Sequence, residues 1–279
     1  MMARDITLET MSERHLDDAV RLSREAGWPH RREDWAMVLS ASDGLVALED
    51  EAVVGTILTT NFDPSTAAIN MVIVDASLRG RGLGRRLMDA ALSRAGSRGC
   101  RLVATQEGLP LYEKLGFVAT GEIVQHQGVP ERTRGVAAIE WAGDKDSARI
   151  ADLDAEAQGF RRDGVLAALS RTARFAVIRE GGTVEAFAAR RPFGRGVVVG
   201  PIVARSPEEA LQLLDTVLAE EPEGAFVRVD TDRTTGLGEP LTERGLVHVG
   251  RGITMRRAPV APVSITPYRT FALVNQALG

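Results

Sequence analysis

Residues 67–86 carry a compact pattern of strand, turn and helix: Ala67-Ala68-Ile69-Asn70-Met71-Val72-Ile73-Val74-Asp75-Ala76-Ser77-Leu78-Arg79-Gly80-Arg81-Gly82-Leu83-Gly84-Arg85-Arg86. An apolar, β-branched run ends at Val74, and apolar residues then recur at helical spacing from Leu87 to Ala95. Glycines in the turn let the backbone approach a ligand, and the free N–H groups of the following helix's first turn form an anion site. The arginines of the turn add forked donors that suit phosphate.

The spacing of this turn excludes two common phosphate-binding motifs. No Gly-Lys-Ser/Thr follows, so it is not a P-loop, and Arg86 and Leu87 stand where a Gly-x-Gly-x-x-Gly turn needs its third glycine. The stretch Arg79-x-x-Gly82-x-Gly84 instead resembles the acetyl-CoA motif of the GNAT N-acetyltransferase superfamily. A second block, Leu111-Tyr112-Glu113-Lys114-Leu115-Gly116-Phe117, is similar to that superfamily's Leu-Tyr-x-Lys-x-Gly-Phe.

Length and composition set the broad class of the protein. The chain has 279 residues, of which 44% are hydrophobic and 26% charged, and this predicts about two globular domains. A formal net charge of -4 gives no nucleic-acid signature, and the apolar runs are too short to span a membrane. The single cysteine, Cys100, fits a reducing compartment. We expect a cytoplasmic monomer or homodimer that binds neither nucleic acid nor membranes and holds no metal.

The order of the predicted elements also resembles the GNAT fold. Residues 45–48 and 53–58 predict a hairpin, and residues 31–40 predict a second helix. Residues 117–124 and 136–141 predict the strands that close the first half. The expected fold class is α/β (α+β): two tandem GNAT-like domains, each a mixed, mostly antiparallel central sheet flanked by helices.

A polar, turn-rich stretch at residues 143–147 marks the predicted boundary, and the second half repeats the first in outline. Its block Leu241-Thr242-Glu243-Arg244-Gly245-Leu246-Val247 aligns with the tyrosine block at the glycine. We therefore expect residues 1–143 to form a GNAT acetyltransferase domain that binds acetyl-CoA. Residues 144–279 are expected to form a degenerate GNAT-like domain.

The two halves differ where the cofactor would bind. The second half has Ser206-Pro207-Glu208-Glu209 in place of the arginine-glycine turn, which predicts a helix start capped by its own side chains. Two glutamates there repel a pyrophosphate, and Leu241 replaces Tyr112. The second half is thus predicted not to bind acetyl-CoA.

The resemblance implies a set of acetyl-CoA contacts and a catalytic tyrosine. A backbone N–H near residues 71–74 would polarise the thioester carbonyl. Tyr112 matches the family's general acid, which protonates the departing thiolate. Thr105 stands where many relatives have asparagine, so it keeps a hydroxyl and loses the amide. The expected cofactor contacts are Met71, Val72, Ile73, Val74, Arg79, Gly80, Arg81, Gly82, Leu83, Gly84, Arg85, Thr105 and Tyr112.

The acceptor side is expected to involve the first helices and the late strands. The residues predicted to bind the acceptor are Trp28, His30, Asp34, Trp35 and His126, in a pocket shared between the halves. Asp34 and His126 join Tyr112 as predicted catalytic residues, while His30 and Glu122 remain alternative bases. Two indoles beside a carboxylate predict a small cationic acceptor. The alternative is that both tryptophans only pack in the core.

These observations predict an N-acetyltransferase that moves an acetyl group from acetyl-CoA to a primary amine of a small molecule by direct attack. One alternative is a non-catalytic sensor that holds CoA or an acyl-CoA. Another is a protein or peptide N-acetyltransferase, although a covering second domain narrows access for large acceptors.

Overall fold

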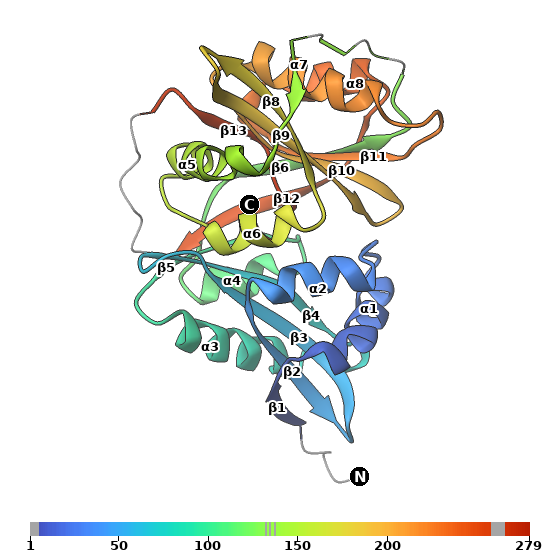
Figure 1. Ribbon diagram of the computed structural model, residues 1–279. Helices are drawn as coiled ribbons and strands as arrows, with labels where there is room; N and C mark the ends of the chain where they lie inside the picture. The colour runs from blue at the N-terminus through green and yellow to red at the C-terminus, as the bar shows by residue number, and fades with distance from the viewer. Residues whose placement is uncertain (1–5, 132, 134, 137, 258–265) are drawn as a thin grey trace.

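The computed structural model describes residues 6–131, 133, 135–136, 138–257 and 266–279. The strands of the first half are β1 (Ile6–Thr10), β2 (Asp43–Glu49), β3 (Ala52–Asn61), β4 (Thr66–Val74), β5 (Gly99–Ala104) and β6 (Val118–Gly128). Its helices are α1 (Leu16–Glu25), α2 (Arg32–Ser40), α3 (Leu83–Ala95) and α4 (Leu109–Lys114). Strand β1 lies at the outer edge of this half (Figure 1).

The second half repeats this order with its own additions. Its strands are β7 (Glu140–Trp141), β8 (Arg174–Glu180), β9 (Thr183–Phe193), β10 (Gly196–Ala204), β11 (Val227–Asp232), β12 (Val247–Arg257) and β13 (Arg269–Ala272). Its helices are α5 (Ser147–Gln158), α6 (Asp163–Ser170), α7 (Pro207–Ala219) and α8 (Gly238–Glu243). None of the helices in the described ranges has the length and apolarity needed to cross a membrane.

All the described strands join one sheet, which runs through both halves in the order β1-β2-β3-β4-β5-β12-β6-β11-β10-β9-β8-β7, with β13 on β10. The pairs β4–β5 and β10–β11 are parallel, and the others are antiparallel. The predicted mixed, mostly antiparallel sheet flanked by helices is confirmed. The predicted hairpins are also present, as β2–β3 and β8–β9.

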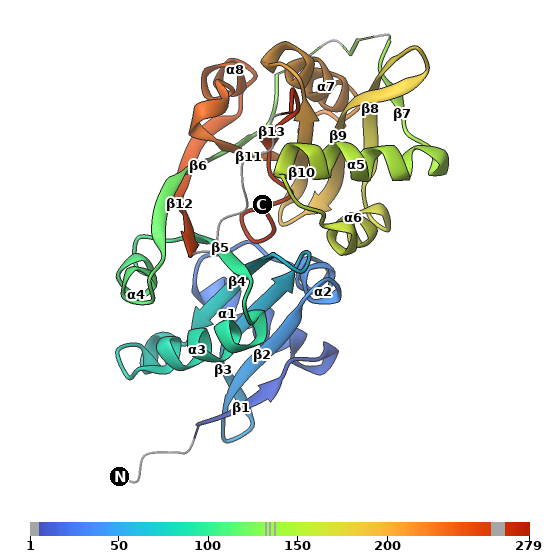
Figure 2. The same cartoon turned by 90° about the vertical axis from the view of Figure 1, so that its left-hand side faces the viewer.

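The two halves exchange their sixth strands. β12 of the second half pairs with β5, with Thr254 opposite Val103, and β6 of the first half pairs with β11, with Val229 opposite His126. β6 and β12 also pair with each other and bridge the halves (Figure 2). The predicted closing strand at 136–141 is wrong in its placement. Among the described residues of this range only Glu140–Trp141 form a strand, and it pairs with β8 of the second half.

Helix α3 packs its apolar side on the sheet of the first half. Leu87, Met88, Ala91 and Ala95 recur at helical spacing and are buried. Burial of a leucine or methionine side chain contributes roughly 1.5–3 kcal/mol each. Helices α1, α2 and α6 share a second core with the C-terminal residues Val274 and Leu278. This core contains residues of both halves, so it fixes one half against the other.

Candidate active site between the two halves

Strands β4 and β5 separate early and leave a wedge-shaped opening in the sheet. Their parallel pairing covers only residues 66–68 of β4, ending with Ala68 opposite Arg101. Further along, β4 carries a bulge opposite Thr56–Leu58, where Met71 has a positive φ of 50°. Such a backbone is uncommon for methionine, and bulges gather next to active sites. The Thr56 hydroxyl donates to the Met71 carbonyl over 2.8 Å, which supports the bulge.

The glycine turn after β4 leads into helix α3. Gly80 and Gly82 have φ values of 75° and 82°, and a Cβ on either would meet nothing within 4 Å. These glycines are therefore required by the backbone conformation rather than by lack of space. No side chain caps the start of α3 at Gly82, so its first N–H groups are available to an anion.

A cavity of about 610 Å³, which we call the turn cavity, lies against this turn. Its lining contains Val72, Ile73, Val74, Arg79, Gly80, Gly84, Thr105 and Tyr112 from the predicted cofactor contacts. Met71 lines the neighbouring cavity instead, and the remaining predicted contacts, Arg81, Gly82, Leu83 and Arg85, line neither. Leu83 is buried in the core, and Arg85 pairs with Asp89.

A second cavity of about 290 Å³, the inner cavity, lies between the halves. The first half contributes Met71 and Tyr112, and the second half contributes Phe193, Arg228 and the segment 275–277. The turn and inner cavities have four lining residues in common: Trp28, Val72, Thr105 and Tyr112. They therefore meet beside the β4 bulge.

Tyr112 lies at this junction and is 8% exposed. Burial raises the pKa of its phenol to about 12, so the hydroxyl is protonated at neutral pH and can donate. Its ring packs against Phe117, with centroids 6.2 Å apart. A Cβ on Gly108 would lie 2.8 Å from the tyrosine ring. Thr105 accepts a hydrogen bond from the Gly108 N–H at its hydroxyl, over 3.2 Å, and so orders the loop before Tyr112.

Asp34 lies outside both cavities, in contrast to its predicted place in the acceptor pocket. It is 2% exposed and accepts hydrogen bonds from Arg31 (2.9 Å) and from the Gly194 N–H (3.1 Å). Burial opposes its ionisation, but these hydrogen bonds outweigh burial and lower the pKa of Asp34. Those two bonds go to Oδ2, and Oδ1 accepts from Nη2 of Arg31 over 2.9 Å, so both oxygens are occupied and Asp34 fastens α2 to the β9–β10 turn.

Of the two tryptophans, only Trp28 lines the cavities. Trp35 is fully buried, and its indole N–H donates to the Ser23 hydroxyl over 2.8 Å, so it packs in the core as the alternative reading stated. His30 lines the inner cavity beside Trp28 and stacks edge-on against Phe193, with centroids 5.4 Å apart. Burial and the nearby Arg228 lower the pKa of His30 to about 4, which makes it neutral at pH 7 and a weak base.

His126 faces away from the inner cavity, because successive side chains of a strand alternate between its faces. Gln125 lines the cavity, whereas His126 is 3% exposed, lies 5.6 Å from the His248 ring and faces Gly238 of α8. The sequence analysis named His126 as a pocket residue, whereas the preceding residue, Gln125, lines the cavity. Glu122, another candidate base, lines neither cavity and pairs with Arg233 over 2.8 Å.

Sequence reasoning missed the lining residues that come from the second half, which are Phe193, Arg228, Gly250, Arg251, Asn275, Gln276 and Ala277. Strand exchange brings them to the first half's wedge, and no local pattern predicts that exchange. One signal was available: Arg228 interrupts the apolar strand Phe226-Val227-Arg228-Val229. A charged residue in a buried strand needs a partner or a ligand.

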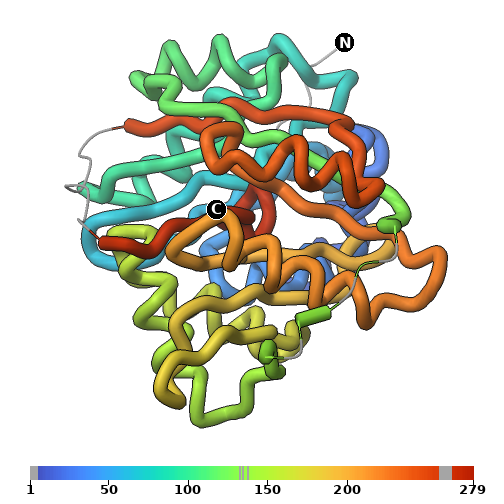
Figure 3. The backbone as a smooth tube through the Cα atoms, turned by 90° about the horizontal axis from the view of Figure 1, so that it is seen from above, coloured from blue at the N-terminus to red at the C-terminus, as the bar shows by residue number. Residues whose placement is uncertain are grey.

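The corresponding wedge in the second half is filled by its own chain. β10 and β11 pair only at Val197–Val227 and Val198–Arg228, and β13 then runs antiparallel to β10. The Leu273 N–H donates to the Asp230 carbonyl over 2.8 Å. The C-terminal end continues to the middle of the molecule (Figure 3). A ligand in this wedge would have to displace β13.

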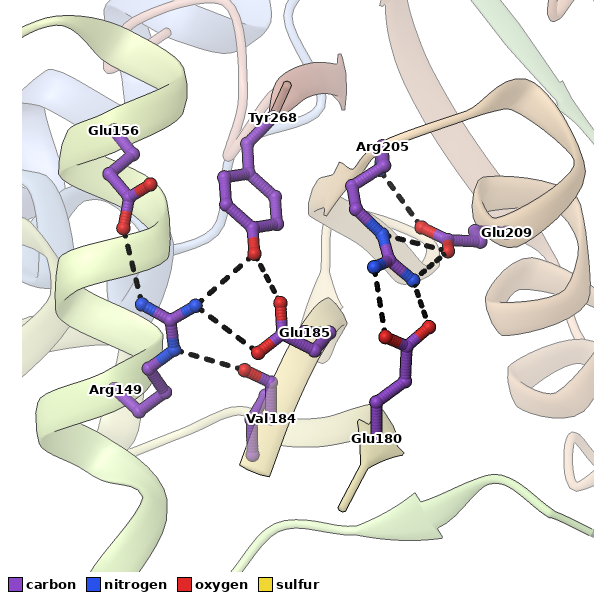
Figure 4. Close-up of polar contacts among 8 residues, drawn as sticks. All are labelled: Arg149, Glu156, Glu180, Val184, Glu185, Arg205, Glu209 and Tyr268. Atoms are coloured by element: carbon purple, nitrogen blue, oxygen red, sulfur yellow. Dashed lines mark hydrogen bonds and ion pairs between the residues drawn. The ribbon is translucent and has the colours of Figure 1, made fainter. Parts of the chain in front are cut away.

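The start of α7 is closed to an anion as well. The Ser206 hydroxyl accepts a hydrogen bond from the Glu209 N–H over 3.3 Å, which confirms the predicted cap. Arg205 pairs with both Glu180 and Glu209, so its charge is compensated (Figure 4). Glu185, on the neighbouring strand β9, accepts hydrogen bonds from Tyr268 and from Arg149 of α5 (Figure 4). This surface is held together by internal ion pairs.

Comparison with protein families gives two matches along the chain. Residues 4–117 match the family model "Acetyltransferase (GNAT) family", and residues 150–264 match "Acetyltransferase (GNAT) domain". The chain is 28% identical over 278 residues to "Uncharacterized N-acetyltransferase YitH" of Bacillus subtilis (strain 168). That alignment covers 96% of this chain and 97% of the relative.

Two solved structures share the whole architecture. One is the crystal structure of "A Putative Acetyltransferase" from Pyrococcus horikoshii, with a TM-score of 0.83, 21% identity, and coverage of 100% of this chain and 98% of the other. The second is a GCN5-related N-acetyltransferase from Sphaerobacter thermophilus. It gives a TM-score of 0.68 and 15% identity, covering 93% of this chain and 98% of that one.

Proposed function

Because this chain is a two-domain member of the GNAT acetyltransferase superfamily, we propose that it transfers the acetyl group of acetyl-CoA to the primary amine of a small molecule. The observation that carries the proposal is the position of Tyr112 where the turn and inner cavities meet. We assign residues 1–143 to the transferase domain and residues 144–279 to the degenerate domain.

In this proposal acetyl-CoA enters as the acyl donor along the turn cavity. Its pyrophosphate binds the free N–H groups at the start of α3, with Arg79 and Arg81 adding positive charge. Arg79 is half-exposed and pairs with Glu107 over 3.2 Å, so it can exchange that partner for phosphate. The thioester then lies beside Val72 at the β4 bulge, where a backbone N–H polarises its carbonyl.

The amine occupies the inner cavity and attacks the thioester carbonyl carbon. A new C–N bond forms, the C–S bond breaks, and the thiolate takes the proton of the Tyr112 hydroxyl, which solvent then replaces. The proton that the amine loses passes to water, because Asp34 and His126 lie outside the cavity and His30 is a weak base. The inner cavity, about 290 Å³ and walled by the second half, favours a small acceptor over a protein side chain.

A screen for CoA release tests the proposal. Purified protein and acetyl-CoA are mixed with amines, amino acids, polyamines or aminoglycosides, and free thiol is measured against the rate of acetyl-CoA hydrolysis. We expect release with at least one small amine and a product heavier by one acetyl group. Tight binding of acetyl-CoA without release from any amine would favour the sensor alternative.

A further inference from the structure

The charged residues that line the inner cavity are both arginines, Arg228 and Arg251, and the described lining contains no aspartate or glutamate. The cationic acceptor expected from the sequence depended on Asp34, which is outside the cavity and covered by Arg31 and Gly194. Arg228 and Arg251 are paired with Asp230 and Glu122, which do not line the cavity, so the described lining offers guanidinium donors but no carboxylate for a second ammonium group on the acceptor.

Arg228 is held in a fixed position with one side of its guanidinium unused. Its Nε and Nη2 donate to the two carboxylate oxygens of Asp230, over 2.9 and 3.0 Å. Its charge lies over the Phe193 ring, 5.2 Å from the centroid. The remaining nitrogen, Nη1, makes no hydrogen bond to any residue in the described ranges, although the side chain lines the cavity.

The groups behind Arg228 keep this arrangement rigid. Asp230 is fully buried and also accepts a hydrogen bond from Gln276 over 3.0 Å. Arg191 lies over the same Phe193 ring, with its guanidinium 5.0 Å from the centroid. A fork held by both a carboxylate and an aromatic ring loses little freedom when it binds a second anion.

His30 lies close enough to Arg228 for the guanidinium charge to act on it. Burial is the largest cause of the low pKa of His30, Arg228 lowers the pKa further, Asp34 opposes this and Arg191 adds to it. The charge of Arg228 therefore disfavours a second cation beside His30. Both halves line the cavity, with Tyr112 and Val72 from the first half and Phe193 and Arg228 from the second.

We propose that the acceptor is an amine that also carries an anionic group, a carboxylate or a phosphate, and that this group binds Arg228 while the amine faces Tyr112. This inference rests on the proposed function. It gives the second half a direct role, since its strands β9 and β11 select the acceptor. Arg251, an exposed lining residue that lies 3.4 Å from Glu122, provides a second guanidinium.

The experiment compares amines of equal length that differ only at the far end. Each series, with two to six carbons between the groups, contains a carboxylate, a phosphate, a neutral carboxamide and a second amine. We expect kcat/KM for the carboxylate or the phosphate to exceed that for the carboxamide and the diamine by about 10- to 100-fold. The ratio between carboxylate and phosphate identifies which anion the site prefers.

Variants locate the effect at Arg228. Arg228→Gln should reduce the preference for the anionic acceptor to within about threefold, with little change for the carboxamide. Because Arg228→Gln leaves Asp230 buried without its cation, the double variant Arg228→Gln/Asp230→Asn and the charge-preserving Arg228→Lys are measured in parallel. The matched control is Arg195→Gln, an exposed arginine of the same half stacked on Phe226, and it should keep the full preference.

Different outcomes would contradict the anionic acceptor and the proposed acetyltransferase function. Equal or faster acetylation of the carboxamide or the diamine would overturn the inference and leave the acetyltransferase intact. A preference for anions that survives in the folded double variant would also overturn it. No CoA release from any of the four classes would contradict both.

Discussion

Tyr112 combines burial with access to both cavities, which is the arrangement a general acid needs. Burial raises the pKa of its phenol to about 12, so the proton is present throughout the physiological range. Of the four residues that line both cavities, Trp28, Val72, Thr105 and Tyr112, the tyrosine phenol is the most acidic, so we assign Tyr112 as the proton donor.

We predict that Tyr112→Phe lowers kcat on the identified acceptor by about 100-fold or more, since a general acid contributes roughly 10²–10⁴-fold. The phenylalanine ring preserves packing against Phe117, so acetyl-CoA affinity should change by less than about threefold. Steady-state kinetics and a binding titration on the same preparation provide the measurement. An unchanged kcat under conditions where chemistry limits the rate would remove Tyr112 from the mechanism.

The low pKa of His30 leads to a prediction about the stability of the protein in acid. Its folded-state pKa, about 4, lies below the unfolded value of 6.5, so between these pH values the unfolded chain binds more protons. The stability that comes from a neutral His30 is fully present above pH 6.5 and is lost as the pH falls toward 4. Stability of the protein should therefore drop by about 1–2 kcal/mol between pH 6.5 and 5.

The acid sensitivity should diminish in His30→Leu, which cannot be protonated. Urea unfolding at pH 7, 6 and 5 gives the comparison, and the exposed His248→Gln serves as the matched control that should behave as the parent. If His30→Leu and the parent lose stability equally over this range, His30 is not the buried titrating group.

At the scale of elements, β13 and the strand exchange determine which half has an open wedge. Gly200 of β10 lies under the C-terminal segment, and a Cβ at this position would be 2.0 Å from the Leu273 carbonyl oxygen. Because that atom is backbone, the clash can be relieved only by moving β10 or the segment that follows β13. That segment also supplies Asn275 and Gln276 to the inner cavity.

We predict that Gly200→Ala destabilises the protein by about 2–4 kcal/mol and lowers kcat/KM for the acceptor. Affinity for acetyl-CoA should hold, because the turn cavity contains no residue of this segment. Gly164→Ala, where an added Cβ meets nothing within 4 Å, is the control and should keep the parent's melting temperature and kinetics. Parental stability in Gly200→Ala would show that the contact with Leu273 is not tight.

For the molecule as a whole, local patterns predicted much of the fold. The turn at 79–84, the β2–β3 hairpin and the cap at Ser206 follow from residues close in sequence. The exchange of β6 and β12 could not be predicted from local patterns. Either strand could pair within its own half with the same alternation of side chains. Strand pairing over such sequence distances is decided by the complete sheet.

The cofactor side of the candidate site could be predicted from the sequence, but most of the acceptor side could not. The cofactor side is encoded by neighbouring residues, and eight of the predicted contacts line the turn cavity. The acceptor side depends on which face of a strand a residue occupies and on which strand lies beside it. Gln125 lines the cavity, whereas the next residue, His126, points to the other face of β6. Arg228 reaches the cavity because β11 pairs with β6.

We propose that the chain holds one acyl-CoA site, in the first half, while β13 and the capped α7 close the second. Calorimetric titration of acetyl-CoA into the intact protein measures the number of sites. Gly82→Glu places a carboxylate at a φ of 82° beside the start of α3 and should weaken binding at least tenfold. Glu208→Gln, at the start of α7, is the matched control and should leave binding unchanged. We predict a stoichiometry of one, lost in Gly82→Glu; two equivalent sites, or unaltered affinity in that variant, would contradict the account.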